Sequence, residues 1–179
     1  GVAVSNKLKN NNNVTAVFTG DGGTSQGDFH EALNLASTWD LPVIFCIENN
    51  GYGLSTPVNE QYAIENLADR GSSYNMDSYI VDGNNIVDVY RCIDSVIKKM
   101  RKDSKPVLIE FKTFRMKGHE EASGQAYIDK KIIEEWSKKD PISHFEDYLL
   151  TSKFISSKDL VEIKEKISNE IDKNWSSAN

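Results

Sequence analysis

The chain has 179 residues, of which 39% are hydrophobic and 27% are charged, as is typical of a globular domain with a substantial core. Its net charge is −6 and its basic residues form no dense cluster, so we expect it to bind neither nucleic acid nor an anionic membrane. No apolar run approaches the length of a membrane span. An anionic ligand would therefore have to be held by local donors and a metal.

The cysteines and histidines offer little disulfide or zinc chemistry. Cys46 falls in an apolar run and Cys92 in an amphipathic stretch, so we expect two buried free thiols and a reducing, cytoplasmic environment. His30, His119 and His144 are too dispersed along the chain to predict a zinc site.

The start of the sequence suggests a piece of a longer protein. It begins at Gly1 rather than at a methionine and enters at once an apparent helix that ends near Lys9. We therefore expect the chain to be the C-terminal portion of a domain whose upstream half is absent.

A β-strand, a helix and a second β-strand follow in short order. Residues 14–19 are apolar and β-branched without interruption, which predicts a strand covered on both faces. Residues 26–38 carry Phe29, Ala32, Leu33 and Ala36 at helical spacing, and residues 43–47 form a second buried strand. This succession predicts an α/β fold with parallel strands and a right-handed crossover.

The next segments alternate in the same way. We expect residues 51–71 to be mostly loop, with a helical turn near residues 62–67, and residues 78–81 to form a third strand. Apolar residues from Ile86 to Met100 mark the face of a helix, and residues 106–111 a fourth strand. Residues 113–125 are polar, contain two glycines and have no clear period, which is typical of a loop.

The remainder of the chain is expected to be helical. Residues 156–159 offer a helix start, with a serine that precedes an aspartate by three positions. The stripe that follows predicts packing on the core or on a partner, and consists of Leu160, Ile163, Ile167, Ile171 and Trp175.

Two turns close the first two strands, with the sequences GDGG at residues 20–23 and NNGYG at residues 49–53. Open parallel sheets bind ligands at the carboxyl ends of their strands, so Asp21 and Asn50 should lie at the same edge. Mg²⁺ prefers oxygen ligands in octahedral geometry and is often shared with a diphosphate. The Asp21 carboxylate, the Asn50 carboxamide and the carbonyl of Tyr52 are candidate ligands.

Each of the two motifs has a plainer interpretation when taken alone. Gly-Asp-Gly and Asn-Asn-Gly are most often simple turns. The pair is more specific, because Asp21 and Asn50 each follow a predicted buried strand directly. The glycines after Asp21 leave backbone N–H groups accessible to phosphate, and the helix that begins near Gln26 adds its positive end.

The GDG and NN motifs resemble the signature of thiamine diphosphate enzymes. The surrounding sequence is similar to the α subunit of the 2-oxo acid dehydrogenase E1 component, most closely the branched-chain member and next the pyruvate member. The stretches that carry this resemblance are GDGGTSQGDFHEALNLAST (20–38), LPVIFCIENNGYGLSTPVNEQYA (41–63), RGSSYN (70–75), IVDGNNIVDVY (80–90) and TFRMKGHE (113–120).

The resemblance implies a three-layer αβα parallel sheet of the thiamine diphosphate-binding fold, present here as its C-terminal portion. Residues 1–126 would bind the diphosphate and Mg²⁺, and residues 127–179 would be a helical segment of the same domain. Within the first part, Asp21, Asn50 and the Tyr52 carbonyl match the Mg²⁺ ligands of the family. The backbone at Gly22 and Gly23 matches its diphosphate contacts.

A further loop matches the family at an arginine and a histidine. By resemblance, Arg115 would contact the diphosphate and His119 would lie in the active site as a catalytic residue. The plainer interpretation is an arginine paired with a surface carboxylate and a solvated histidine. Glu120 occupies the place of a serine that is phosphorylated in mammalian relatives, so we expect no such regulation here.

The resemblance implies oxidative decarboxylation of a 2-oxo acid, a branched-chain one being favoured, with acyl transfer to a lipoylated E2. The glutamate that activates the cofactor belongs to a β subunit or a fused β-like half, in an α2β2-type or homodimeric assembly. The chain alone is expected to be inactive, and other cofactor and substrate contacts lie outside it. The alternatives are a pyruvate or acetoin dehydrogenase α subunit, and a catalytically incomplete module that binds cofactor or assembles only.

Two further classes are less well supported by the residues. A plain nucleotide-binding domain would need a glycine-rich loop such as G-x-G-x-x-G or G-x-x-x-x-G-K, and the chain has neither. Another thiamine enzyme, such as a transketolase or an acetoin-cleaving relative, is disfavoured by the loop that carries Arg115 and His119 and by the STP-x-x-EQY stretch.

Overall fold

The computed structural model describes residues 1–120, 122 and 124–178, which fall into two compact units. The first unit is Gly1–Lys138 and the second is Lys139–Asn179. The first unit therefore includes α5 (Lys130–Ser137), which lies beyond the division after residue 126 that the sequence suggested.

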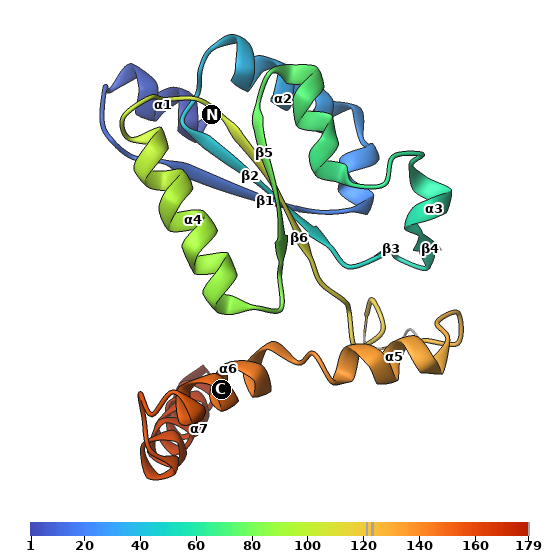
Figure 1. The fold of residues 1–179 in the computed structure, drawn as a ribbon, viewed down its shortest axis with the longest axis vertical. Helices are drawn as coiled ribbons and strands as arrows, with labels where there is room; N and C mark the ends of the chain where they lie inside the picture. Colours follow the sequence, from blue (N-terminus) through green and yellow to red (C-terminus); the bar gives the residue numbers. More distant parts are fainter. Residues whose placement is uncertain (121, 123, 179) are drawn as a thin grey trace. The chain divides into compact units, whose positions relative to one another are not determined.

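A sheet of four parallel strands forms the centre of the first unit (Figure 1). The strand order is β1 (Thr15–Gly20), β2 (Val43–Asn49), β6 (Val107–Lys112) and β5 (Asp77–Asp82). All four strands predicted from the sequence are confirmed, and so is their parallel pairing. Because β2 and β6 occupy the middle of the sheet, they are buried along most of their length.

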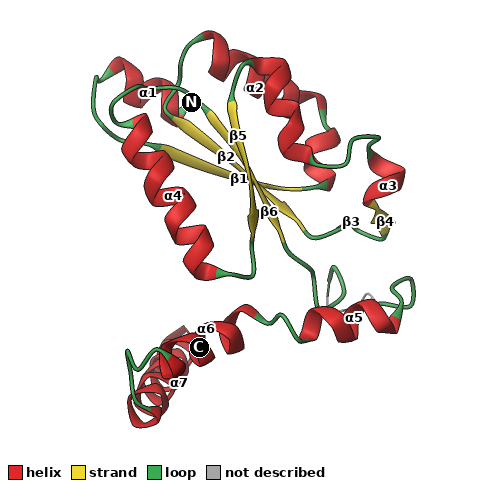
Figure 2. Cartoon of the chain, viewed as in Figure 1, coloured by secondary structure: helices red, strands yellow, loops and turns green. Residues whose placement is uncertain are grey.

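Side chains of β2 alternate between two apolar cores, one on each face of the sheet. Val43, Phe45 and Ile47 pack with residues of the helices α1 (Val2–Leu8) and α2 (Gly27–Thr38). Ile44 and Cys46 pack with residues of α4 (Ile86–Met100) on the opposite face. The sheet therefore lies between two helical layers, as Figure 2 shows, and the predicted three-layer αβα arrangement is confirmed.

The helices begin and end close to the predicted positions. In α4, the Oδ1 atom of the N-cap residue Asn85 accepts hydrogen bonds from the backbone N–H groups of Val87 and Asp88, at 3.2 and 3.4 Å. The buried face of α2 consists of Phe29, Leu33 and Ala36. Ala32 was expected on that face and is exposed instead, because the helix turns it beyond the edge of the apolar stripe.

The segment predicted to be mostly loop holds four short elements. A hairpin of β3 (Tyr52–Gly53) and β4 (Thr56–Pro57) is followed by α3 (Val58–Gln61) and the 3₁₀ helix η2 (Leu67–Tyr74). In place of the single helical turn expected near residues 62–67, the structure has α3 just before this stretch and η2 from Leu67 onward. Two-residue strands and single turns are too short to produce a hydrophobic period, which is why the sequence pattern missed them. The described residues of 113–125 form neither helix nor strand, and residues 121 and 123 lie outside the described part.

The first strand differs from its prediction in one respect. β1 pairs with β2 on one side and is an edge strand of the sheet, and Val17 and Phe18 are 42% and 64% exposed. The expectation that this strand is covered on both faces is therefore wrong for this chain. A continuous run of apolar, β-branched residues predicts a strand that could be buried on both faces. Whether the strand is in fact buried depends on which helices and strands pack against it.

Burial also determines the pKa of the two cysteine thiols. Cys46 is buried and Cys92 is half-buried, and both are free. Burial raises the pKa of the Cys46 thiol to about 11 and also raises the pKa of Cys92. Both thiols are therefore protonated and poorly nucleophilic near neutral pH.

The second unit contains α6 (Pro141–Thr151) and α7 (Ser157–Ala178). The predicted start of α7 is confirmed as a reciprocal cap: the Ser156 N–H donates to Asp159 Oδ2 at 2.8 Å, and the Asp159 N–H donates to Ser156 Oγ at 3.2 Å. The predicted apolar stripe is largely exposed within this chain, at Ile163, Ile167, Ile171 and Trp175. Among the described residues, no helix is both long and apolar enough to span a lipid bilayer.

The packing of α2 against the sheet gives a first prediction. Leu33 is fully buried against β2, whereas Leu35, two positions along the same helix, is 42% exposed. Leu33→Ala should lower the free energy of unfolding by about 2–5 kcal/mol, because it removes buried methyl groups and leaves a cavity. The matched change Leu35→Ala should cost about 0.5 kcal/mol or less. Urea denaturation of both variants checks this, and equal losses would contradict the assignment of the core.

Candidate functional site

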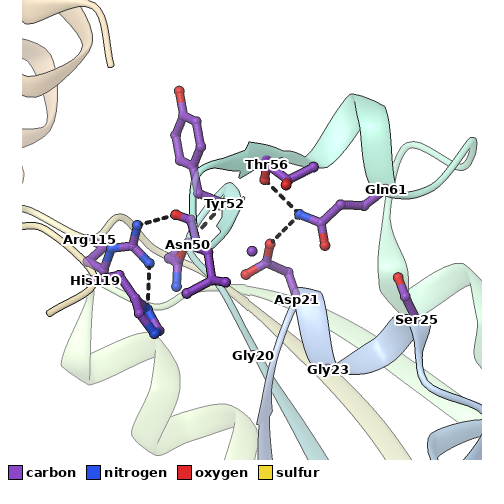
Figure 3. Close-up of a pocket in the computed structure, with 13 residues that line it drawn as sticks. Gly20, Asp21, Gly23, Ser25, Asn50, Tyr52, Thr56, Gln61, Arg115 and His119 are labelled. Atoms are coloured by element: carbon purple, nitrogen blue, oxygen red, sulfur yellow. Dashed lines mark hydrogen bonds between the residues drawn. The ribbon is translucent and has the colours of Figure 1, made fainter. Parts of the chain in front are cut away.

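The site lies at the carboxyl ends of β1 and β2. β1 ends at Gly20 and is followed by the short 3₁₀ helix η1 (Gly22–Ser25), while β2 ends at Asn49 and leads into the β3–β4 hairpin. A pocket of about 630 Å³ opens between these turns, within the range usual for small-molecule sites. Its lining consists of Gly20, Asp21, Gly22, Gly23, Ser25, Asn50, Tyr52, Gly53, Leu54, Thr56, Gln61, Arg115 and His119 (Figure 3).

Every site residue named from the sequence lies in this lining. Asp21 comes from the first turn and Asn50 and Tyr52 from the second, although they are far apart along the chain. Arg115 and His119 come from the segment after β6 and reach the same pocket (Figure 3). The structure thus brings the predicted residues together, while the chemical role of each remains a prediction.

The backbone carbonyl of Asp21 accepts two hydrogen bonds, whereas its carboxylate accepts a weak one. The Thr24 N–H and Oγ1 donate to the Asp21 carbonyl oxygen at 3.1 and 2.7 Å. The carboxylate accepts a long bond of 3.4 Å, from Gln61 Nε2 to Oδ2. Asp21 is only 1% exposed, because the pocket wall covers it. A buried carboxylate with so weak a partner suits a bound cation.

The second turn is shaped by two consecutive asparagine side chains. Asn49 Oδ1 accepts the Gly51 N–H, and Asn50 Oδ1 accepts the Tyr52 N–H, both at 3.1 Å. Gly51, between Asn50 and Tyr52, has φ +86°, a left-handed conformation that glycine adopts without strain. The two bonds orient the Asn50 carboxamide toward the pocket, where its oxygen retains a second lone pair.

Glycines leave the floor of the pocket bare. A Cβ atom on Gly22 would lie 3.1 Å from the Gly53 Cα, and one on Gly23 would lie 2.4 Å from Thr19 Oγ1. A side chain at Gly23 would therefore have to displace the Thr19 hydroxyl, and one at Gly22 would press against the Gly53 backbone. Bare backbone N–H groups at the start of a helical turn are the donors that a phosphate needs at close range.

Arg115 is tied to the hairpin. Its Nη2 donates to the Leu54 carbonyl oxygen at 2.6 Å and to the Tyr127 hydroxyl at 2.7 Å. His119 Nδ1 lies 3.4 Å from Arg115 Nη1. Arg115 Nε donates to the Lys117 carbonyl oxygen at 3.3 Å. Of the five N–H donors of the guanidinium, the contacts among the described residues leave one on Nη1 that can bind an anion.

Several residues around the site were missed by the sequence reasoning. Gln61 contacts the Asp21 carboxylate, and Tyr127 holds Arg115. Glu110, a fully buried carboxylate in β6, lies behind the second turn and accepts a bond of 2.7 Å from Asn49 Nδ2. A glutamate within the apolar run VLIEF (107–111) was the available signal, since buried charges need partners. His30 lies away from the pocket, with Nδ1 2.8 Å from the Tyr74 hydroxyl.

The donor set fits a hard divalent cation shared with a bound anion. A carboxylate, a carboxamide oxygen and a main-chain carbonyl from Asp21, Asn50 and Tyr52 are ligands that Mg²⁺ accepts. Within the described residues, no cluster of three or more His, Cys, Asp or Glu is placed to hold a metal alone. The remaining ligands would therefore come from phosphate oxygens and water.

The chain is similar to known proteins along its whole length. A family model described as dehydrogenase E1 component matches residues 1–179. The α subunit of acetoin:2,6-dichlorophenolindophenol oxidoreductase from Bacillus subtilis is 42% identical over 97% of this chain and 52% of its own length. The pyruvate dehydrogenase E1 α subunit of Acholeplasma laidlawii is 35% identical over 96% of this chain and 50% of its own.

A third relative and a solved structure complete the comparison. The mitochondrial 2-oxoisovalerate dehydrogenase α subunit of Caenorhabditis elegans is 39% identical over 79% of this chain and 33% of its own length. A Mycobacterium smegmatis protein, described as thiamin diphosphate-dependent, has a TM-score of 0.49 at 13% identity, over 64% of this chain and 20% of that chain. This chain spans about half the length of the first curated relatives that it matches.

The bare glycine turn gives a second prediction. Gly23→Ala should destabilise the chain by about 1–3 kcal/mol, because the new methyl group overlaps Thr19 Oγ1. Adding Thr19→Ala removes that oxygen and should recover most of the loss. Gly27→Ala is the matched control, since a Cβ there meets nothing within 4 Å. Urea midpoints of the single and double variants decide the matter, and strict additivity of the two changes would refute the clash.

Proposed function

The chain belongs to the dehydrogenase E1 component family, and we propose that it forms the part of a thiamine diphosphate-dependent enzyme that binds the diphosphate and Mg²⁺. The observation that carries this proposal is the meeting of Asp21, Asn50 and the backbone of Tyr52 in one pocket. The glycine floor beside them gives phosphate the close approach to backbone that it requires.

Each residue has a distinct task in this proposal. Asp21 supplies the anionic ligand to Mg²⁺, and Asn50 and the Tyr52 carbonyl supply neutral oxygens. The N–H groups of the turn at Gly22 and Gly23 hydrogen-bond the phosphate oxygens. The cation is needed because a chain of net charge −6 offers no broad positive field to a diphosphate.

Arg115 and His119 act from the loop after β6. Arg115 donates to the diphosphate with the Nη1 N–H that its contacts to Leu54, Lys117, His119 and Tyr127 leave available. His119, beside Arg115, donates a hydrogen bond or moves a proton at the substrate near neutral pH. Bound thiamine diphosphate supplies the electron sink for breaking the bond next to the substrate carbonyl.

The whole enzyme would use this site for oxidative decarboxylation of a 2-oxo acid, with acyl transfer to a lipoylated E2. Two relatives have names that describe them as E1 or oxidoreductase α subunits, which supports a β partner, separate or fused, that completes the site. We further propose that the assembly is of the α2β2 type or homodimeric, and that it lies in the cytoplasm. The proposed metal is Mg²⁺. A chain without that partner would bind cofactor or assemble without turning over substrate.

Two substrate classes are candidates. The stretch NNGYGLSTPVNEQYA favours a branched-chain 2-oxo acid, in line with the 39% identity to a 2-oxoisovalerate dehydrogenase α subunit. The 42% identity to an acetoin oxidoreductase α subunit, over nearly the whole chain, favours acetoin as a second candidate. Both substrates carry a carbonyl beside the bond to be broken, so the same cofactor serves either.

A third prediction tests the metal ligand. In the assembled enzyme, Asp21→Asn keeps the shape of the side chain and removes its charge. The Mg²⁺ concentration needed for thiamine diphosphate binding should rise by more than about 10-fold, since changes even in residues behind a metal ligand cost that much. Asp28→Asn, an exposed carboxylate in the first turn of α2, is the control. Calorimetric titration measures both, and unchanged Mg²⁺ dependence in Asp21→Asn would exclude the assignment.

A fourth prediction separates the substrates. Steady-state kcat/KM of the assembled enzyme should be highest for 2-oxoisovalerate if the branched-chain proposal holds, with pyruvate at least about 10-fold lower, as a pocket shaped for extra methyl groups allows. Acetoin, tested with a dye acceptor, is the third substrate. A higher kcat/KM for acetoin or pyruvate would overturn the branched-chain proposal while leaving the cofactor site intact.

A further inference from the structure

A buried carboxylate lies behind the pocket. Glu110 is fully buried in the central strand β6, outside the pocket lining. Its Oε1 accepts hydrogen bonds from Asn49 Nδ2 at 2.7 Å and from Lys112 Nζ at 2.6 Å. Its Oε2 accepts the backbone N–H of Ala68, in η2, at 2.9 Å. A buried carboxylate with this many donors is held rigidly, because moving it would break its hydrogen bonds and leave a buried charge without partners.

The contact to Asn49 connects Glu110 to the second turn of the pocket. The side-chain Nδ2 of Asn49 also donates to the Tyr62 hydroxyl at 3.1 Å, and its side-chain Oδ1 accepts the Gly51 N–H. The Asn49 side chain is thereby fixed at both ends. Because Asn50 is the next residue, the position of its carboxamide follows from how Asn49 is held.

The helix η2 continues the same network to the first turn. Arg70, two residues after the Ala68 that Glu110 binds, donates from Nη1 to the Thr24 carbonyl oxygen at 2.6 Å. Thr24 in turn holds the Asp21 carbonyl. The Arg70 guanidinium also lies over the Tyr62 ring, 5.6 Å from its centroid. A chain of buried and part-buried contacts therefore joins the Asp21 turn to the Asn50 turn from behind the pocket.

We propose that Glu110, with Tyr62 and Arg70, positions the two turns so that Asp21 and Asn50 present their oxygens to one Mg²⁺ ion; this inference rests on the proposed function. Mg²⁺ demands nearly ideal octahedral geometry, so its affinity depends on how well the ligands are placed before it binds. Residues that orient ligands without touching the metal commonly control affinity in this way. Glu110, Tyr62 and Arg70 are positioning residues and not catalytic ones.

Two variants test the proposal in the assembled enzyme. Glu110→Gln keeps the shape of the side chain but removes the negative charge to which Asn49, Ala68 and Lys112 donate. Tyr62→Phe keeps the aromatic ring that Arg70 contacts but removes the hydroxyl that accepts a hydrogen bond from Asn49. The Mg²⁺ concentration for half-maximal thiamine diphosphate binding, measured by calorimetry, should rise about 10–100-fold for Glu110→Gln. For Tyr62→Phe it should rise about 2–10-fold, the loss of one hydrogen bond. Glu31→Gln and Tyr90→Phe, both exposed, are the controls.

A role confined to stability would give a different pattern. If these residues position the metal ligands, saturating Mg²⁺ should restore kcat in both variants to near the parent value, while the half-saturating concentration stays raised. Lower melting temperatures with the Mg²⁺ dependence of the parent would overturn the proposal. Should Glu110→Gln fail to fold, Tyr62→Phe decides alone, because its only loss is a hydroxyl group. Absence of any Mg²⁺-dependent binding in the parent enzyme would instead refute the proposed function, and this inference with it.

Discussion

The parallel pairing of β1 with β2 is the constraint on which the site depends. In the register of this pair, Gly20 lies opposite Glu48, so the two turns that follow begin at the same edge of the sheet. Residues 21 and 50 therefore meet although a whole helix separates them along the chain. The side-chain period of a strand is two, so a slip of one residue would turn the core residues of β2 to the wrong face. The apolar cores on the two faces thus fix the register, and the register fixes the site.

The site illustrates how an acidic chain can hold an anion. The net charge of −6 repels a diphosphate at long range, so attraction has to come from groups within contact distance. In the proposed function, backbone N–H groups, Arg115 and a bound cation would provide it without a positive surface. Two carboxylates, Asp21 and Glu110, are buried here. Among the described residues, Glu110 is satisfied by protein donors, whereas the Asp21 carboxylate accepts a single long bond, from Gln61. This contrast fits the proposed role of Asp21 as a metal ligand and of Glu110 as a structural carboxylate.

Much of the fold could be predicted because the strands and long helices carry strong periods. The runs at residues 14–19 and 43–47, and the face of α4, were found because apolar patterning and local propensity agree there. The turns of Asp21 and Asn50 were found because glycine and asparagine mark strand ends. Burial was harder to predict: Asp21 is covered by segments distant in sequence, and β1 is left at an edge. Glu110 and Tyr127 were missed because their partners come from other elements, and no local pattern encodes a tertiary contact.

The contacts in the pocket wall also bear on how a ligand could enter. Gln61 Nε2 donates to the Thr56 carbonyl oxygen at 2.9 Å and to Asp21 only at 3.4 Å. A cation at Asp21 would replace the weaker bond, and the stronger one would still hold the hairpin against α3. On the other side, Arg115 has short bonds to Leu54 and Tyr127 and a longer one from Nε to the Lys117 carbonyl oxygen, so the contacts among the described residues leave one Nη1 N–H for an anion. A cofactor bound as proposed would displace the weak bond at Asp21 and use this N–H of Arg115, and a site that changes little on binding keeps more of its interaction energy as affinity.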